Sequence, residues 1–520
     1  MLARAHTFTL DGLDVHRVAV EVDVRRGLPA FTIIGLPDAA LREARERVHT
    51  AILNSGFEFP AQRVTANLAP ANVPKAGPGL DLALACALLA ATGQLPPASL
   101  ERHVLLGELA LDGSVRGCEG ALAIADATHR AGLPALALAH SHAREAMLVP
   151  GLQVAPLRSL QSAARLLRGG AGDPPAPSPI PRPADRRPDG SRPGPDLAEV
   201  CGQHHAVRAL IIAAAGGHNL LLSGAPGTGK TMLAHRLAAI LPPLSVAESV
   251  EVARIASLAG RSVTALARGR PFRAPHHSIT AAGLVGGARR GWIGEVVLAH
   301  NGVLFLDELA EFARPTLEAL RQPLEEGQIA IARARHIATY PARFMLLAAT
   351  NPCGCGRAGG EEPCSCTEAQ LARHRRRLSG PLLDRIDLLA GLARHDREGL
   401  TAPALTSSAR ARERVQAARE RQAARRDRDG VALNAHLDPA ALLSHARLDG
   451  RSEAMLRRAG ERGMLSARGQ LRVLRVARTL ADLDASDRVR ARDVGSALAL
   501  RPETALTETA EQPATSGRSR

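Results

Sequence analysis

Apolar and polar positions divide the first part of the chain into expected strands and helices. Val15–Arg25 alternates between the two kinds of residue, as a strand with one buried face does. Leu41–Ser55 has the spacing of a helix that Gly56 is placed to end, and the apolar run Leu80–Leu89 predicts a buried helix. Further strands are expected at Phe31–Leu36, Val64–Leu68, Val104–Leu111 and Ala135–Ala139. Residues 1–168 therefore predict an α/β or α+β unit with its own core.

Residues 169–195 break this pattern. The stretch is dense in proline, glycine, aspartate and arginine, and it lacks the apolar residues that a folded unit buries. Proline also keeps such a segment extended. We therefore expect a Pro/Gly-rich linker here and a second unit that begins at Asp196.

A glycine-rich loop lies between an expected strand, Asn219–Ser223, and an expected helix, Met232–Ile240. The loop reads G-x-x-x-x-G-K-T and consists of Gly224, Ala225, Pro226, Gly227, Thr228, Gly229, Lys230 and Thr231. In a strand–loop–helix context, the backbone N–H groups of such a loop and the helix N-terminus bind a polyphosphate. We expect Lys230 to reach the β- and γ-phosphates of ATP, and Thr231 to bind Mg²⁺.

Two later apolar runs end in side chains that suit ATP hydrolysis. The run GVLFLDE ends in Asp307 and Glu308, and the run FMLLAATN ends in Asn351. Ligands of open α/β sheets bind where the strands end. We therefore expect Asp307 to hold Mg²⁺, Glu308 to act as the base that polarises the attacking water, and Asn351 to orient that water.

The last part of the chain predicts helices. Ala409–Arg428 places Glu413 and several arginines at helical spacing, which predicts a charged helix with opposite-charge pairs along it. Further helices are expected at Ala440–Leu448, Glu453–Arg462, Gly469–Leu483 and Arg492–Leu500. We expect a helical lid over residues 405–502 and a disordered polar tail over residues 503–520.

Composition bounds the size and the partners. A chain of 520 residues is expected to form about two to four domains. Its formal net charge of +15 favours a polyanion such as nucleic acid, and an arginine-rich composition without a specific partner is the alternative. The sequence shows no apolar stretch of roughly 20 residues and no signal peptide, so we expect a cytoplasmic protein without a membrane partner.

Four of the seven cysteines form two close C-x-C pairs, Cys353 with Cys355 and Cys364 with Cys366. Four thiols at this spacing suit a tetrahedral structural Zn²⁺. Because C-x-C is tighter than the usual C-x-x-C, free thiols in a loop are the alternative. The neighbouring His276 and His277 are expected to point apart, so we expect them to share no metal.

Two glycine- or arginine-rich inserts, residues 273–295 and residues 328–343, interrupt the second unit. The second alternates like a hairpin. Arginines there are expected to follow a DNA phosphate backbone, and a tryptophan to stack on a base. Surface hairpins that pack between subunits are the alternative. The candidate nucleic-acid contacts are Arg289, Arg290 and Trp292 in the first insert, and Arg333 and Arg335 in the second.

Many separated stretches resemble one family in the same order. They include GGHNLLLSGAPGTGKTMLA, FRAPHHSITAAGLVGG, LAHNGVLFLDELAEF, SGPLLDRIDL and LSARGQLRVLRVARTLADL. The chain is similar to the ComM/YifB family of AAA+ ATPases, which is related to the ATPase subunit of magnesium chelatase, over about residues 1–168 and 196–502. The resemblance implies hexameric rings and DNA-dependent work such as branch migration by a helicase.

The same resemblance implies roles for individual residues. Arg385 in PLLDRIDL matches the arginine finger, which points into a neighbouring subunit's nucleotide. Arg468 in LSARGQL matches the sensor-2 arginine of the lid, although Arg472, Arg475 and Arg478 lie on or near the same helix and leave its register open.

The N-terminal unit resembles the Lon-protease-like domain at the front of such ATPases, through TANLAPANVPKAGPGLDLALA and LLGELALDGSVRGCEGALA. Active proteases of that fold use a serine and a lysine. Those positions align near Gly79 and Leu122, which can act neither as a nucleophile nor as a base. We therefore expect an inactive scaffold.

The expected fold is α/β, with an N-terminal Lon-protease-like α+β domain, a P-loop AAA+ α/β core over residues 196–400 and a C-terminal helical lid. The expected function is Mg²⁺-dependent ATP hydrolysis by a homo-oligomeric ring, a hexamer. The ring would act on single-stranded or branched DNA in homologous recombination or natural transformation. A chelatase-type remodeller of a protein partner is the alternative.

Overall fold

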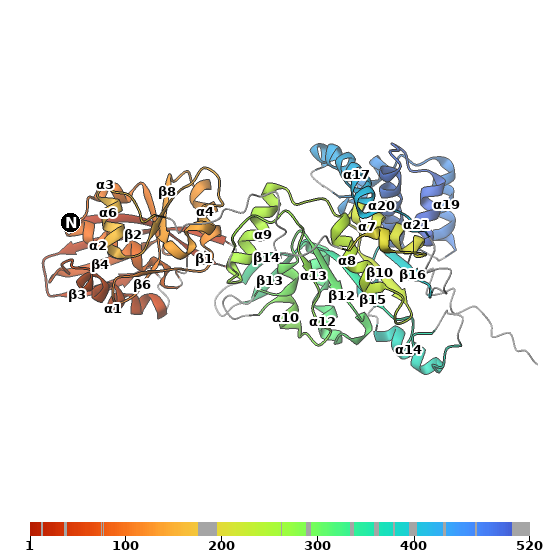
Figure 1. The fold of residues 1–520 in the computed structure, drawn as a ribbon, viewed down its shortest axis with the longest axis horizontal. Helices are drawn as coiled ribbons and strands as arrows, with labels where there is room; N and C mark the ends of the chain where they lie inside the picture. Colours follow the sequence, from red (N-terminus) through yellow and green to blue (C-terminus); the bar gives the residue numbers. More distant parts are fainter. Residues whose placement is uncertain are drawn as a thin grey trace, which may run out of the picture.

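The computed structural model has three parts that follow one another along its long axis (Figure 1). A seven-stranded sheet with helices comes first, then a five-stranded sheet, and last a group of helices. Among the described residues, no helix is long and apolar enough to cross a membrane. The structure describes residues 1–11, 14–35, 39–73, 75, 77–174, 195–261, 263–287, 293–332, 337–357, 363–377, 380–394, 403–429, 433–462 and 465–501. The expected tail and most of the expected linker lie outside these ranges.

The N-terminal sheet has the strand order β3-β4-β2-β1-β5-β8-β9 and mixes parallel with antiparallel pairs. Its strands are β1 (Leu2–Asp11), β2 (Asp14–Arg25), β3 (Ala30–Ile34), β4 (Arg63–Ala69), β5 (His103–Leu106), β8 (Ala135–Ala139) and β9 (Gln153–Leu157). The strand expected at Val104–Leu111 is divided between β5 and a small ribbon of β6 (Glu108–Leu109) and β7 (Val115–Arg116). The helices of this part are α1 (Ala39–Asn54), α2 (Asp81–Ala91), α3 (Pro97–Leu100), α4 (Ala121–Arg130), α5 (Ala143–Ala146) and α6 (Leu160–Leu167).

Helix α2 is the centre of the N-terminal core, because every one of its residues is buried. A helix that is apolar on all sides is stable only in such an interior. Its single acid, Asp81, accepts hydrogen bonds from Arg47 at 2.8 and 3.1 Å. Burial raises the pKa of Asp81 to about 6, although the hydrogen bond and charge of Arg47 oppose that shift. The buried helix expected at Leu80–Leu89 is confirmed.

The central sheet has the strand order β11-β12-β15-β10-β16, and all its neighbouring strands are parallel. Its strands are β11 (Phe272–Arg273), β12 (Val303–Leu306), β15 (Met345–Thr350), β10 (Leu220–Gly224) and β16 (Leu388–Leu392). Beside it, β13 (Gln328–Ala332) and β14 (Ile337–Pro341) form an antiparallel hairpin. The helices are α7 (His204–Gly216), α8 (Lys230–Ile240), α9 (Val246–Leu258), α10 (Ala281–Val285), α11 (Glu295–Leu298), α12 (Arg314–Glu318), α13 (Arg321–Glu326), α14 (Glu368–Arg377) and α15 (Gly380–Leu383). The expected mixed α/β fold with a parallel sheet is confirmed.

The last part is helical and packs on the central part in one continuous core. Its helices are α17 (Ser408–Asp429), α18 (Pro439–Ala446), α19 (Gly450–Glu461), α20 (Ala467–Leu483) and α21 (Ala491–Ala499). Figure 1 shows α17 and α20 beside α7. Arg412 and Arg419 of α17 donate to the carbonyls of Ala239 and Ala214, near the C-terminal ends of α8 and α7. Helix C-termini carry unsatisfied carbonyls and partial negative charge, so these arginines serve the contact between parts instead of the expected pairs along α17.

Helix α9 joins the first part to the second. Its residue Ala253 lies in one apolar cluster with Phe8 and Leu122 of the N-terminal part. Next to it, Arg254 lies 3.4 Å from Asp126 of α4. Figure 1 shows α4 and α9 facing each other. The two parts therefore share an apolar contact with an ion pair beside it, in addition to the chain that connects them.

A buried ion cluster fixes the helical part. The side chain of Asp482, at the end of α20, is fully buried and accepts hydrogen bonds from Arg478 at 2.8 Å and from Arg425 at 2.6 and 2.8 Å. Asn434 donates a further hydrogen bond at 2.7 Å. Burial alone would raise the pKa of Asp482, but the hydrogen bond from Arg425 and the charges of both arginines outweigh it and lower the pKa. The cluster therefore stabilises the fold at neutral pH, and that contribution is lost as the pH falls through the lowered pKa.

We expect Asp482→Ala to lower the free energy of unfolding by about 3–5 kcal/mol, because it leaves two neighbouring arginine charges without their acid. Urea denaturation at neutral pH measures this loss. Asp484→Ala is the matched control, since Asp484 pairs with Arg492 at 2.6 Å on the surface of the same part. It should cost less than about 1 kcal/mol. Equal losses for the two variants would contradict the role given to the buried cluster.

Candidate nucleotide site

The glycine-rich loop begins where β10 ends and leads directly into α8, as expected. Gly227 and Gly229 have φ angles of +79° and +91°. This left-handed region favours glycine because it lacks a Cβ. At Gly224 a Cβ would lie 2.8 Å from the Thr228 hydroxyl and 2.9 Å from the Leu392 carbonyl. The loop backbone is therefore held close to its neighbours, with the N-terminus of α8 beside it, which is the form of a phosphate cradle.

Lys230 stands at the start of α8 and turns back over the loop. Its Nζ donates to the carbonyls of Gly224 and Ala225 at 2.8 and 2.9 Å, and to Asn351 Oδ1 at 3.0 Å. Burial lowers the pKa of Lys230, while the charges of nearby acids oppose that shift. Because all three acceptors are neutral, the ammonium group keeps a charge that a phosphate can neutralise.

The next residue, Thr231, contacts the end of β12. Its Oγ1 donates to Asp307 Oδ2 at 2.6 Å, and the other oxygen of Asp307 accepts from the Glu308 amide at 2.9 Å. A hydroxyl and a carboxylate at this distance supply the hard oxygen ligands that Mg²⁺ prefers beside substrate phosphates. The donor set therefore fits the magnesium ion that a nucleotide brings.

Glu308 has an unusual backbone and an unexpected neighbour. Its φ angle of +52° lies in the left-handed region, a costly conformation for a residue with a side chain and one that is common at functional sites. Its Oε2 lies 3.3 Å from Nδ1 of His277. The expectation that His276 and His277 point apart is wrong, since their ring centroids are 4.0 Å apart. The contact of His277 with Glu308 could not be predicted from the local sequence, because the acid lies about 30 residues further along the chain.

Asn351 completes this edge of the sheet. It directly follows β15, which lies between β10 and β12 in the sheet. The strand order thus places the Asn351 amide between Lys230, which follows β10, and the two acids that follow β12. His374 of α14 donates from Nε2 to the Asn351 carbonyl at 2.9 Å, which fixes the backbone there. The structure brings Lys230, Thr231, Asp307, Glu308 and Asn351 together.

Arg385 lies at the opposite edge of the same sheet. Its carbonyl accepts a hydrogen bond at 2.9 Å from Asn219, the residue that precedes β10, and its guanidinium pairs with Glu325. The five residues of β10 separate Asn219 from the loop by about 16 Å. Arg385 is therefore placed away from the nucleotide loop of its own chain, as an arginine that serves a neighbouring subunit must be.

The lid arginines occupy different environments. Arg478 is buried in the ion cluster described above, and Arg475 donates to the Leu437 carbonyl at 3.0 Å. Arg468 is exposed in the first turn of α20. Arg475 and Arg478 therefore have structural partners, and the side chain of Arg468 is exposed to solvent.

The four paired cysteines converge directly after Asn351. The Cys353 sulfur lies 3.3 Å from that of Cys355 and 3.6 Å from that of Cys364, and Cys355 lies 3.4 Å from Cys364. With Cys366, all four sulfurs lie within 4.8 Å of one another. A hydrogen bond from the Arg357 backbone, with bonds from its neighbours, lowers the pKa of Cys355 to about 5. The two C-x-C pairs therefore form one cluster, which is compatible with the expected Zn²⁺.

The candidate DNA contacts lie outside the described residues, although their setting is partly visible. Arg289, Arg290, Trp292, Arg333 and Arg335 are not described. The described strands β13 and β14 do pair in the expected hairpin, with Gln328 opposite Pro341. The second insert is therefore a β-hairpin beside the central sheet.

The positions of the two protease residues hold no reactive group. Leu122 is fully buried in α4. Gly79 lies against Cys118, where a Cβ would be 3.2 Å from the sulfur. Neither position holds a serine or a lysine, so the sequence itself lacks the pair at these two positions.

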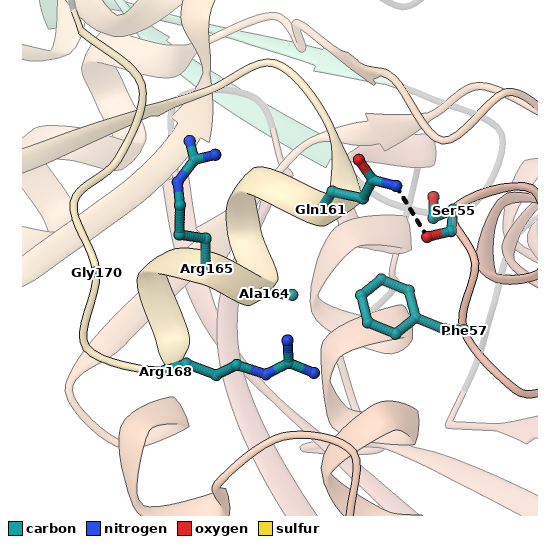
Figure 2. Close-up of a pocket in the computed structure, with 7 residues that line it drawn as sticks. All are labelled: Ser55, Phe57, Gln161, Ala164, Arg165, Arg168 and Gly170. Carbon is teal, nitrogen blue, oxygen red and sulfur yellow. Dashed lines mark hydrogen bonds between the residues drawn. The ribbon is translucent and has the colours of Figure 1, made fainter.

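A hollow of about 510 Å³ in the N-terminal part, shown in Figure 2, lies away from this chemistry. Its two arginines already have partners. Arg165 donates to Asp173 at 2.7 Å, and Arg168 donates to the Gln94 carbonyl at 3.0 Å and lies over the ring of Phe57. The arginines of this hollow are therefore engaged within the N-terminal part.

Comparisons with known proteins agree with this geometry. Models of the magnesium chelatase subunit ChlI match residues 20–142 and 196–400, and the model of its C-terminal region matches residues 405–501. The protein YifB of Escherichia coli (strain K12) is 44% identical over 490 residues, which cover 94% of this chain and 94% of that protein. Competence protein ComM of Haemophilus influenzae is 39% identical over 500 residues, which cover 96% of this chain and 97% of that protein.

The chain belongs to the magnesium-chelatase-like ComM/YifB family. This family is of the AAA+ ATPase type, and it implies ATP and Mg²⁺ as cofactors. A shorter stretch is 27% identical over 174 residues to the protein named Probable DNA helicase MCM9 of Arabidopsis thaliana. That match covers 34% of this chain and 22% of the helicase.

In this member of the ComM/YifB family, we expect Asn351→Asp to weaken both ATP binding and turnover. The new carboxylate would pair with Lys230 and compete with the phosphates for its charge, and the amide donor would be lost. We expect ATP turnover to fall by about 10²-fold and ATP affinity to fall with it. Steady-state kinetics and a fluorescent ATP analogue measure the two effects. Asn54→Asp, at an exposed amide of the N-terminal part, is the control. Unchanged affinity would contradict the role given to the Lys230–Asn351 contact.

Proposed function

We propose that this chain hydrolyses ATP at the edge formed by β10, β12 and β15. The observation that carries the proposal is the contact of Thr231 with Asp307 beside the contact of Lys230 with Asn351. Lys230 binds the β- and γ-phosphate oxygens, and Thr231 and Asp307 hold Mg²⁺. The metal ion, when bound, neutralises charge on the phosphates.

The remaining two residues of the edge act on water. Glu308 accepts a proton from the attacking water and so raises its nucleophilicity. Asn351 orients the same water through its amide. His277 lies 3.3 Å from the Glu308 carboxylate and holds it in position, while the backbone of Glu308 has a strained, positive φ angle.

A second part of the proposal is a ring of identical subunits, a hexamer. Arg385 lies at the sheet edge remote from its own loop, which supports a role across a subunit seam. There it stabilises the charge that develops on the transferred phosphoryl group. Arg468, exposed on α20, is the candidate sensor-2 arginine for the nucleotide held near the lid.

We further propose that DNA, single-stranded or branched, is the polymer on which the ring works, in the cytoplasm. The net charge of +15 supports a polyanionic partner. The name of ComM refers to competence, and the more distant match is named a DNA helicase. Together they favour branch migration or translocation during recombination. The candidate contacts are Arg289, Arg290, Trp292, Arg333 and Arg335 in the two inserts.

A chelatase-type remodeller of a protein partner is the second candidate. The observation that favours it is that all three matching family models describe a magnesium chelatase subunit. In either case we propose that the N-terminal part is an inactive Lon-protease-like scaffold that contacts the motor through α9, and that the helical part is its lid. The two candidates differ in whether DNA alters ATP turnover.

We expect DNA to raise the ATP turnover of the full chain, because a motor that moves along a polymer couples its cycle to that polymer. ATP turnover measured with and without single-stranded and branched DNA tests this. Glu308→Gln should lower turnover by about 10²-fold or more while ATP still binds. Glu311→Gln, an exposed acid in the next turn that pairs with Arg377, is the control. If neither single-stranded nor branched DNA changed the rate of ATP turnover, the result would favour the remodeller of a protein partner instead.

The seam is tested by mixing two inactive variants. Arg385→Ala should lower turnover by about 10³-fold, and Glu308→Gln should do so for a different reason. In a mixed ring, an intact Arg385 from one subunit meets an intact Glu308 from its neighbour at about a quarter of the seams. Turnover should therefore return on mixing. Arg377→Ala, which removes an exposed ion pair, is the control and should keep full turnover. Mixed rings that stay inactive would contradict the placement of Arg385 across a seam.

A further inference from the structure

The turn that follows β15 carries the four cysteines and lies against the glycine-rich loop. We propose that Cys353, Cys355, Cys364 and Cys366 bind one structural Zn²⁺, and that this ion holds the turn in place as a support for the phosphate loop and Asn351. The metal site is independent of the proposed function. Only the supporting role rests on the proposal that the loop binds ATP.

The arrangement of the sulfurs matches a single tetrahedral ion. Four thiolates bound to zinc at about 2.3 Å stand about 3.8 Å from one another. The sulfurs of Cys353, Cys355 and Cys364 are separated by 3.3, 3.4 and 3.6 Å, and all four sulfurs lie within 4.8 Å of each other. Among the residues that the structure describes, this group contains no acid or histidine, so its described donors are thiols. Soft sulfur donors in this geometry select zinc or iron over magnesium and calcium.

Backbone amides surround the sulfurs as they do in a second coordination shell. The amides of Arg357 and Ser365 are hydrogen-bonded to the Cys355 sulfur. The Cys366 amide is bonded to the Cys364 sulfur, and the Cys355 amide to the Cys366 sulfur. Such bonds orient thiolates and reduce their charge, which a metal-binding thiolate site requires. Cys353 is fully buried.

The same turn touches the nucleotide loop. The amide of Gly356 donates to the Cys353 carbonyl at 3.0 Å, which closes the turn, and Gly356 has a φ angle of +76°. A Cβ at Gly356 would lie 2.4 Å from Cδ of Pro226 and 3.0 Å from its Cγ. Only a glycine permits this approach. The turn therefore packs directly on the proline of the phosphate loop.

The turn is also continuous with the water-orienting amide. Asn351 precedes Cys353 by two residues, and its Oδ1 accepts from Lys230 at 3.0 Å. The ion would tie the end of β15 to a second C-x-C pair about ten residues away, and closing such a loop limits its freedom. The ion therefore supports two sides of the nucleotide site, the proline of the loop and the amide beside Lys230.

The metal content of the purified full chain tests the site without any nucleotide. We expect about one zinc per chain in the wild type and in Cys201→Ser, and less than about a tenth of that in a Cys364→Ser, Cys366→Ser double variant. Elemental mass spectrometry measures it, and a mercurial that blocks thiols should release the zinc from the wild type, so the result does not depend on the variant's folding. Wild-type protein with no zinc, with iron, or with disulfides between these cysteines overturns the proposal.

The affinity for a fluorescent ATP analogue tests the supporting role. The zinc-free double variant should bind it about 10-fold or more weakly than Cys201→Ser does. Gly356→Ala keeps all four cysteines but pushes the turn from Pro226, so it should retain zinc and lose a similar factor in affinity. Unchanged affinity in both variants overturns the supporting role. A wild type that holds zinc but binds no nucleotide would instead count against the proposed ATP site.

Discussion

The 2.6 Å hydrogen bond between Thr231 and Asp307 joins the start of α8, which follows β10, to the end of β12. Strands β10 and β12 are not neighbours in the sheet. The hydrogen bond exists because all strands of the central sheet run parallel, so their carboxyl ends meet at one edge. The strand between them, β15, sets Asn351 into the gap, where it contacts Lys230. One topological constraint therefore collects a cation, two acids, a hydroxyl and an amide from three segments, the first and last of which are 121 residues apart. The same constraint sends Arg385 to the far edge, because it precedes β16 and does not follow it.

The arginines of the chain have more than one role. Arg412 and Arg419 bind carbonyls at the C-terminal ends of α8 and α7, and Arg478 is neutralised by a buried acid. Arginine suits such positions because its donors reach a carbonyl or a carboxylate in a fixed geometry. Some of the arginines therefore stabilise the contact between the central and the helical parts. The number of arginines that a polyanion can reach is smaller than composition alone suggests.

Local patterns predicted part of the strands and helices and the glycine-rich loop, since a parallel strand, a glycine loop and a helix each have a recognisable pattern within a few residues. Strand β1 was not predicted, because its polar residues His6, Thr7 and Thr9 are buried and hide the alternation of a half-buried strand. The contact of His277 with Glu308 was also missed, because it depends on how distant segments pack. The meeting of the two cysteine pairs could be predicted, because two C-x-C pairs at metal-ligand spacing imply that their four thiols lie together.

Helices α8 and α9 together contact all three parts of the structure. Helix α9 follows α8, whose first residue is Lys230, by only a few residues, and it carries Ala253 into the apolar cluster of the N-terminal part. On the other side, Arg412 of α17 holds the C-terminal end of α8. Packed elements transmit small shifts because their interiors resist compression. A shift of α8 would therefore reach the helical part through Arg412 and the N-terminal part through α9. This makes α8 the element that connects the glycine-rich loop to the rest of the chain.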